Sequence, residues 1–191
     1  MSYSWSFHSF SEEAFRNVFG GSSPERAGEF LRSATSAGGV SPAIAPAARS
    51  MLTSGISYLG VSRDAARAMD EAIKFAFSPE GLEAELGIEH LSPDGIHPST
   101  IAELVRRLDA PAPLLSCLLR GRRFGQTEPA DCGYCIFRPD EISAVLNETR
   151  GAFAASAPWS AEYMPELLRE CLVEPFEAAE SAGRPVFCDL S

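Results

Sequence analysis

The first residues of the chain alternate between small polar and aromatic side chains. Tyr3, Trp5 and Phe7 are separated by single serines, and this period of two is typical of a strand with one buried face. Two later segments, at 132–137 and 185–190, are short and apolar and follow polar or turn-forming residues. The pattern therefore predicts three short strands, at residues 2–8, 132–137 and 185–190.

Elsewhere the apolar residues recur at spacings of three and four, which predicts amphipathic helices. The clearest helix follows Ser62, a residue type that caps helix N-termini, and its apolar positions are Ala65, Ala68, Met69, Ala72, Ile73 and Ala76. Ser9 and Glu12 have capping-box spacing for a first helix. Further helices are predicted from Pro24, over 47–59, and as a long final helix that ends at Gly183.

Three short strands are too few for a doubly wound sheet. The pattern predicts an α+β fold that is predominantly helical, with a small mixed sheet covered by helices. A length of 191 residues fits one globular domain, residues 1–191. The segment 36–46 is rich in Gly, Ser, Pro and Ala and predicts a flexible loop.

The chain is acidic. It has 16 basic and 26 acidic side chains, a formal net charge of −10. Such a charge repels the phosphates of nucleic acids and anionic lipids, so no nucleic-acid partner is expected. The same charge suits a basic protein partner, although it also serves solubility alone.

The sequence predicts a cytoplasmic protein. Its first residues lack a basic region followed by an apolar run, which argues against a signal peptide. No segment approaches the roughly 18 apolar residues of a membrane span, so no membrane association is expected. Abundant Ala, Arg, Gly and Pro with few lysines indicate a bacterial source.

Cys132 and Cys135 form a C-G-Y-C sequence that suits a redox pair or half of a zinc site. A redox pair needs a helix start at its first cysteine, but Pro139 follows closely and a polar loop precedes. A zinc site needs four ligands, and no second pair is evident. We favour a buried strand in which both cysteines are small apolar residues, and neither a metal nor a cofactor is predicted.

Two other groups of residues suit chemistry. His90, Asp94 and His97 fall within eight residues, and a histidine beside a carboxylate can transfer protons. No nucleophile accompanies them, so a surface loop with local hydrogen bonds is the favoured interpretation of these weak catalytic candidates.

Arg120, Arg122 and Arg123 stand together in an otherwise acidic chain. Arginines bind phosphate or carboxylate through paired hydrogen bonds, so these three are candidates for anion binding. Neutralisation of the protein's own acidic groups, or of a helix C-terminus, is the simpler explanation.

The segment 132–142 resembles the YfbM-like bacterial proteins of unknown function. Gly133 and Tyr134 match the strand of that family, and Pro139, Asp140 and Glu141 match the helix start that follows it. The similarity covers residues 99–190 and does not include the paired cysteines. It implies an α+β fold and a cytosolic bacterial location, and it supplies no catalytic residues.

No dinucleotide-binding, phosphate-loop, zinc-protease or serine-hydrolase motif is present. Our leading hypothesis is a non-enzymatic binding or regulatory protein of the bacterial cytosol, such as an immunity-type or inhibitor protein that acts on a basic partner. One alternative is a small-molecule enzyme with a pocket near Arg120–Arg123 or His90–His97. A second is thiol or zinc chemistry at Cys132 and Cys135. The sequence does not rule out a small-molecule ligand.

Overall fold

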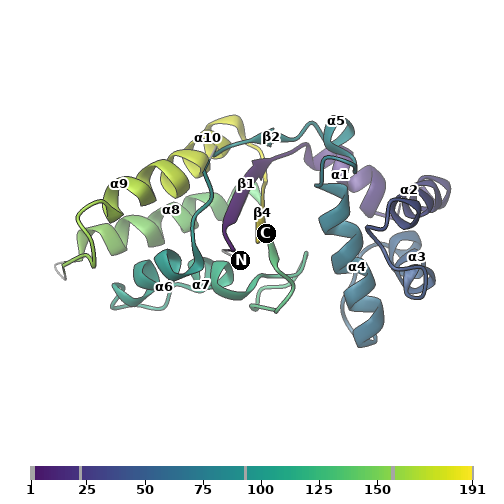
Figure 1. The fold of residues 1–191 in the computed structure, drawn as a ribbon, viewed down its shortest axis with the longest axis horizontal. Helices are drawn as coiled ribbons and strands as arrows, with labels where there is room; N and C mark the ends of the chain where they lie inside the picture. The colour runs from purple at the N-terminus through teal and green to yellow at the C-terminus, as the bar shows by residue number, and fades with distance from the viewer. Residues whose placement is uncertain (1–2, 22, 93, 156–157, 191) are drawn as a thin grey trace. The chain divides into compact units, whose positions relative to one another are not determined.

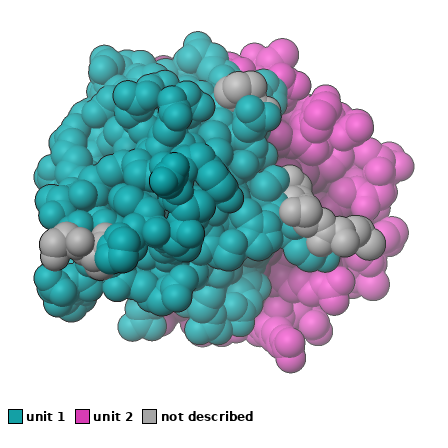
Figure 2. All heavy atoms as spheres, turned by 60° about the vertical axis from the view of Figure 1, so that its left-hand side comes forward, with its two compact units in different colours: residues 1–9, 89–122, 127–191 teal, residues 10–88, 123–126 magenta. Residues whose placement is uncertain are grey.

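The computed structural model describes residues 3–21, 23–92, 94–155 and 158–190. The chain divides into two compact units, which Figure 2 colours separately. Unit 1 comprises residues 1–9, 89–122 and 127–191, and unit 2 comprises residues 10–88 and 123–126. The single-domain organisation stays a prediction.

Unit 1 contains a four-stranded antiparallel sheet. Its strands are β1 (Trp5–Ser9), β2 (Glu89–His90), β3 (Tyr134–Phe137) and β4 (Val186–Leu190), in the order β2-β1-β4-β3. The three predicted strands are confirmed. Each begins later than predicted, and the first ends at Ser9, one residue beyond the predicted end; residue 2 lies outside the described residues. Two details were wrong, because the sheet has a fourth strand, β2, and is wholly antiparallel, not mixed.

Helices cover one face of this sheet. They are α6 (Pro98–Arg106), α7 (Pro113–Arg120), α8 (Pro139–Ala154), α9 (Met164–Leu168) and α10 (Glu174–Ala182). Helix α10 packs on α8, α8 on α7, and α7 on α6 (Figure 1). Phe7, Cys135 and Cys188 lie side by side across the strands and belong to the same buried cluster as Val145 and Phe176 of the helices. The fold is therefore α+β and mostly helical.

The long final helix contains a wider turn, η1 (Arg169–Val173), between α9 and α10. The Glu174 N–H donates to the Arg169 carbonyl five residues earlier. Pro175 follows directly, and in a regular α-helix its ring would collide with the carbonyl four residues before it. The wider turn accommodates the proline, so the predicted helix continues through this position to Gly183.

Unit 2 is helical. Its helices are α1 (Glu12–Phe19), α2 (Pro24–Ser36), α3 (Ala45–Ser54), α4 (Arg63–Ala76) and the short α5 (Glu83–Leu86). Helix α3 packs on both α2 and α4. The core is rich in aromatic rings, with Phe15 stacked on Phe19 at 4.5 Å between centroids and Phe124 at 5.1 Å from Phe15. Phe124 attaches the segment 123–126 to this unit.

Serine caps set the starts of several helices. Ser62 accepts a hydrogen bond at the start of α4, as the sequence predicts, and Ser23 does the same at the start of α2. The first helix is instead capped by Ser11, because Ser9 is paired with β4 as the last residue of β1.

The third helix spans 45–54, not 47–59. It ends at Gly55, whose positive φ of 82° suits a residue without a side chain. Residues 37–44 connect α2 to α3 as predicted, with Val40 buried. The flexibility of this loop stays a prediction. In the part of the chain that the structure describes, no helix is long and apolar enough to cross a membrane.

Candidate functional site

The three arginines proposed from the sequence as an anion site each bind a carboxylate of the protein itself. Arg120 makes two hydrogen bonds of 2.8 Å to Asp131. Arg122 binds Glu141, and Arg123 binds Asp70, which also accepts a hydrogen bond from Tyr58. The arrangement matches the simpler explanation, in which these charges neutralise one another within the chain.

The ion pair of Arg122 and Glu141 is the most buried of these contacts. The Arg122 side chain is 3% exposed and reaches Glu141 through two bonds of 2.8 and 2.9 Å. It also donates to the Ile136 carbonyl and lies over the Phe137 ring. Burial alone would raise the pKa of Glu141, but Arg122 and the Arg138 backbone N–H together lower it. This pair joins the segment that follows α7 to the start of α8, and the bond to Ile136 ties the same arginine to β3, which is a structural role.

The five cysteines carry free thiols. Cys135 lies in β3 opposite Cys188 of β4, and its thiol contacts the Cys117 carbonyl at 3.2 Å. Burial raises the pKa of Cys135 and of Cys188 well above the ordinary value, which disfavours the thiolate that redox or metal chemistry requires. Cys132 is partly exposed and its thiol contacts the Tyr134 carbonyl.

Cys132 and Cys135 therefore differ in solvent exposure and do not form a single reactive thiol pair. Among the described residues, no group of three or more His, Cys, Asp or Glu side chains is placed to hold a metal ion. Cys135 occupies the buried strand position favoured from the sequence. For Cys132 that expectation was wrong, because this residue precedes β3 and is partly exposed.

The three residues considered for acid–base chemistry have separate local roles. His97 caps α6, where its Nδ1 accepts the Ser99 backbone N–H at 3.1 Å. The Asp94 backbone carbonyl accepts a hydrogen bond from Ser92. His90 lies in β2 with its ring 4.7 Å from that of His8. Residue 93 of this loop lies outside the described residues.

The acidic excess is concentrated in unit 1. This unit has 16 acidic and 8 basic residues, whereas unit 2 has 10 and 8. A row of exposed glutamates follows the continuous helix formed by α9, η1 and α10, and its members are Glu166, Glu170, Glu174 and Glu177. The spacing of four, four and three residues places them along one side of that helix.

The two ends of this row differ in whether an arginine neutralises the glutamates. Glu177 binds Arg150 at 3.1 Å, and Glu174 lies 3.9 Å from Arg169. Glu166 and Glu170 have no salt bridge to any cation of the described residues. Tyr163, which directly precedes α9, is 65% exposed. We call Tyr163, Glu166 and Glu170 the acidic helix face.

Sequence reasoning recognised the acidic excess but not its location. The spacing of residues 166, 170, 174 and 177 was the signal that would have indicated a row on one helix.

Comparison with protein-family models, with curated proteins and with solved structures finds no match to this chain. The resemblance to YfbM-like proteins stays a prediction from the sequence.

Proposed function

We propose that the protein is a non-enzymatic binding protein that recognises a basic partner through the acidic helix face of unit 1. The observation that carries the proposal is the pair Glu166 and Glu170, two exposed carboxylates one helical turn apart that no cation of the described chain neutralises. A cationic surface on a partner would supply the missing charge.

Some helical glutamates of the chain are neutralised, whereas Glu25 and Glu29 of α2 share the spacing and exposure of this pair. Glu12 and Glu71 each have an arginine at a distance of four residues, with contacts of 2.6 and 2.9 Å. Like charges at this spacing destabilise a helix by roughly 0.2–0.5 kcal/mol. Glu166 and Glu170 therefore lower stability slightly, and neutralisation by a bound partner would remove that cost.

Two further features support recognition at this face. Complementary charge accelerates the encounter between proteins, and unit 1 carries most of the negative charge. Tyrosine is enriched in protein interfaces, and Tyr163, three residues before Glu166, is 65% exposed. An immunity-type or inhibitor role in the bacterial cytosol is the finer form of this proposal and rests on the sequence.

The local roles of the catalytic candidates also favour binding over catalysis. His97 caps a helix, and Arg120, Arg122 and Arg123 are engaged by carboxylates. These contacts give no support to an enzyme site at either loop.

The test compares three baits in lysate of the source organism at low and moderate salt. They are the wild type, the double variant Glu166→Lys/Glu170→Lys, and the control Glu13→Lys/Glu80→Lys, which changes the net charge equally at exposed positions of unit 2. We expect a basic protein that the wild type and the control retain and the Glu166/Glu170 variant loses. Equal retention by all three baits, or no retained protein, would contradict the proposal.

A further inference from the structure

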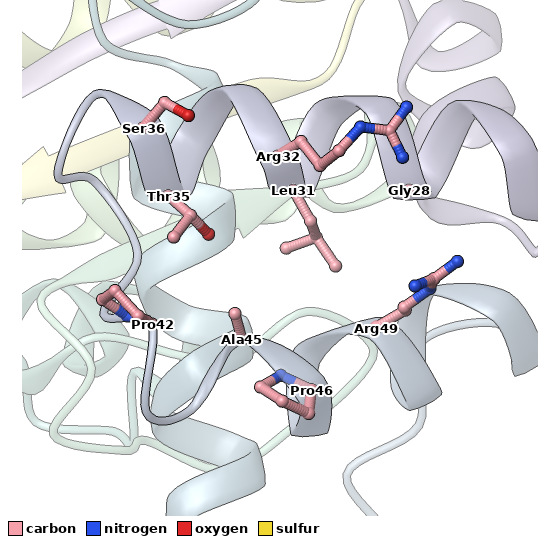
Figure 3. Close-up of a pocket in the computed structure, with 9 residues that line it drawn as sticks. All are labelled: Gly28, Leu31, Arg32, Thr35, Ser36, Pro42, Ala45, Pro46 and Arg49. Atoms are coloured by element: carbon pink, nitrogen blue, oxygen red, sulfur yellow. The ribbon is translucent and has the colours of Figure 1, made fainter.

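A groove runs between α2 and α3 of unit 2 (Figure 3). Its volume of about 450 Å³ lies within the range of known ligand sites. Every residue that lines it comes from 28–49, so the groove is complete within one helix pair and its connection.

The middle of the groove is apolar. Leu31 points from α2 toward α3, and Ala45 and Pro46 face it from the start of α3, with Pro42 in the connection (Figure 3). Apolar side chains of this kind favour a ligand that has an apolar body, because its surface leaves water on binding.

One end of the groove carries two arginines from opposite walls. Arg32 belongs to α2 and Arg49 to α3, and both side chains extend over the end near Gly28 (Figure 3). A Cβ atom placed on Gly28 would lie 3.7 Å from Arg32 Nη1 and 3.6 Å from Arg49 Nη2. The two guanidinium groups therefore approach the same point above Gly28.

These two charges are not neutralised within the described chain. Neither side chain makes a hydrogen bond or an ion pair with a described residue, and no acidic residue lines the groove. Other arginines of unit 2, such as Arg16, Arg26 and Arg67, have carboxylate partners. Two cations that lie close together repel each other, and an anion bound between them would attract both and offset the repulsion.

Gly28 lies within α2, where glycine costs about 0.5–1 kcal/mol relative to alanine. Its lack of a side chain leaves open the space that the two guanidinium groups face. That space suits a small anionic head group.

We infer that the groove binds an amphipathic carboxylate, a small molecule with one carboxylate head and an apolar body. The head lies between Arg32 and Arg49, and the body follows Leu31, Ala45 and Pro46 toward Thr35 and Ser36. Residues 28 to 36 of α2 span about 12 Å at the rise of an α-helix, which sets the length of the body. This site is independent of the acidic helix face.

The walls of the groove decide between ligand classes. Both walls are helices, whose interior backbone groups already bond within the helix, and the amides of a peptide would lose water there without gaining partners. Arginine pairs with carboxylate and phosphate alike, but a phosphate head presents three strong acceptor oxygens and the groove lining supplies two cations. A carboxylate, with two oxygens, matches that number. Apart from its two arginines, the lining of the groove has no ionisable side chain, so we expect it to bind its ligand without altering it.

The test measures binding of decanoate by isothermal titration calorimetry, at concentrations below those at which decanoate forms micelles. Decan-1-ol, decylamine and decyl phosphate serve as matched probes with a neutral, a cationic and a phosphate head. We expect decanoate to bind about tenfold or more tightly than the alcohol, because its head gains charge-assisted hydrogen bonds, and the amine not to bind. Tighter binding of decyl phosphate than of decanoate would overturn the assignment of the head group.

Variants separate this site from nonspecific binding. Arg32→Gln and Arg49→Gln should each weaken decanoate binding about tenfold. Arg63→Gln, which removes another exposed arginine of unit 2 that lies outside the groove, should leave it unchanged. Gly28→Ala should keep the fold, because the added Cβ meets only the ends of flexible side chains, yet weaken binding by filling the head-group space.

Circular dichroism confirms that each variant remains folded. Absence of decanoate binding by the wild type, or equal binding by the Arg32, Arg49 and Arg63 variants, would contradict the inference. Neither result bears on the proposed basic partner, since Glu166 and Glu170 belong to the other unit.

Discussion

Replacing Glu141 by glutamine removes one negative charge from a buried ion pair and nearly preserves the shape of the side chain. The Arg122 cation, only 3% exposed, then lacks its counter-charge. Loss of one partner from a buried pair costs about 3–5 kcal/mol, because the remaining charge stays desolvated. That is a large part of the roughly 5–15 kcal/mol that stabilises a folded protein.

Urea denaturation followed by circular dichroism measures this loss. The midpoint for Glu141→Gln should fall strongly, while the dependence of the unfolding free energy on urea stays unchanged. The matched control is Asp131→Asn, which breaks the pair with Arg120. Those side chains are 61% and 75% exposed, so the control should lose far less stability than Glu141→Gln.

The double variant Arg122→Met/Glu141→Gln tests the explanation itself. It removes the buried cation, and the glutamine can still accept the Arg138 N–H that Glu141 accepts at 2.9 Å. Most of the lost stability should therefore return. Equal losses for Glu141→Gln and Asp131→Asn, or no recovery in the double variant, would refute the assignment of Arg122 as a buried charge that depends on Glu141.

Two further outcomes follow from the pKa directions. Burial would raise the pKa of Glu141, but Arg122 and Arg138 hold it below the ordinary value of 4.5. The ion pair therefore contributes its full stability above pH 4.5. This contribution is lost as the pH falls through the lower pKa of the folded state. Urea midpoints at about pH 6 and pH 3 should differ more for the wild type than for Glu141→Gln. Burial raises the pKa of Cys135, so a disulfide reagent applied to the native protein near neutral pH should modify Cys132 first. The variant Cys132→Ser should lack the fast phase, and a fast phase that persists in this variant would contradict the placement of the thiols.

Local spacing was enough to predict most elements of the fold. The helix after Ser62 and the first strand have side-chain periods that a few residues reveal, and the last strand is a short apolar run after turn-forming residues. Strand β2 has only two residues, too few to show a period. Ser9 matched the spacing of a helix cap, but its pairing with Val186 places it in a strand, and such pairing depends on residues distant in the sequence.

The contacts of charged side chains were less predictable for the same reason. Arg123 binds Asp70, which lies 53 residues away along the chain. The grouping of Arg120, Arg122 and Arg123 in sequence suggested one anion site, yet each has its own carboxylate. Conversely, Arg32 and Arg49 are well separated in sequence, and only the pairing of α2 with α3 brings them to Gly28.

The most direct test of the proposed function is the dissociation constant of the captured basic partner, measured for purified proteins at low and high salt. For the variant Glu166→Lys/Glu170→Lys, we predict a dissociation constant about tenfold or more above that of the wild type at low salt, with a smaller difference at high salt as the charges are screened. The control Glu13→Lys/Glu80→Lys should bind nearly as the wild type does. Equal weakening by both double variants would show that only net charge matters, and it would contradict recognition through the acidic helix face.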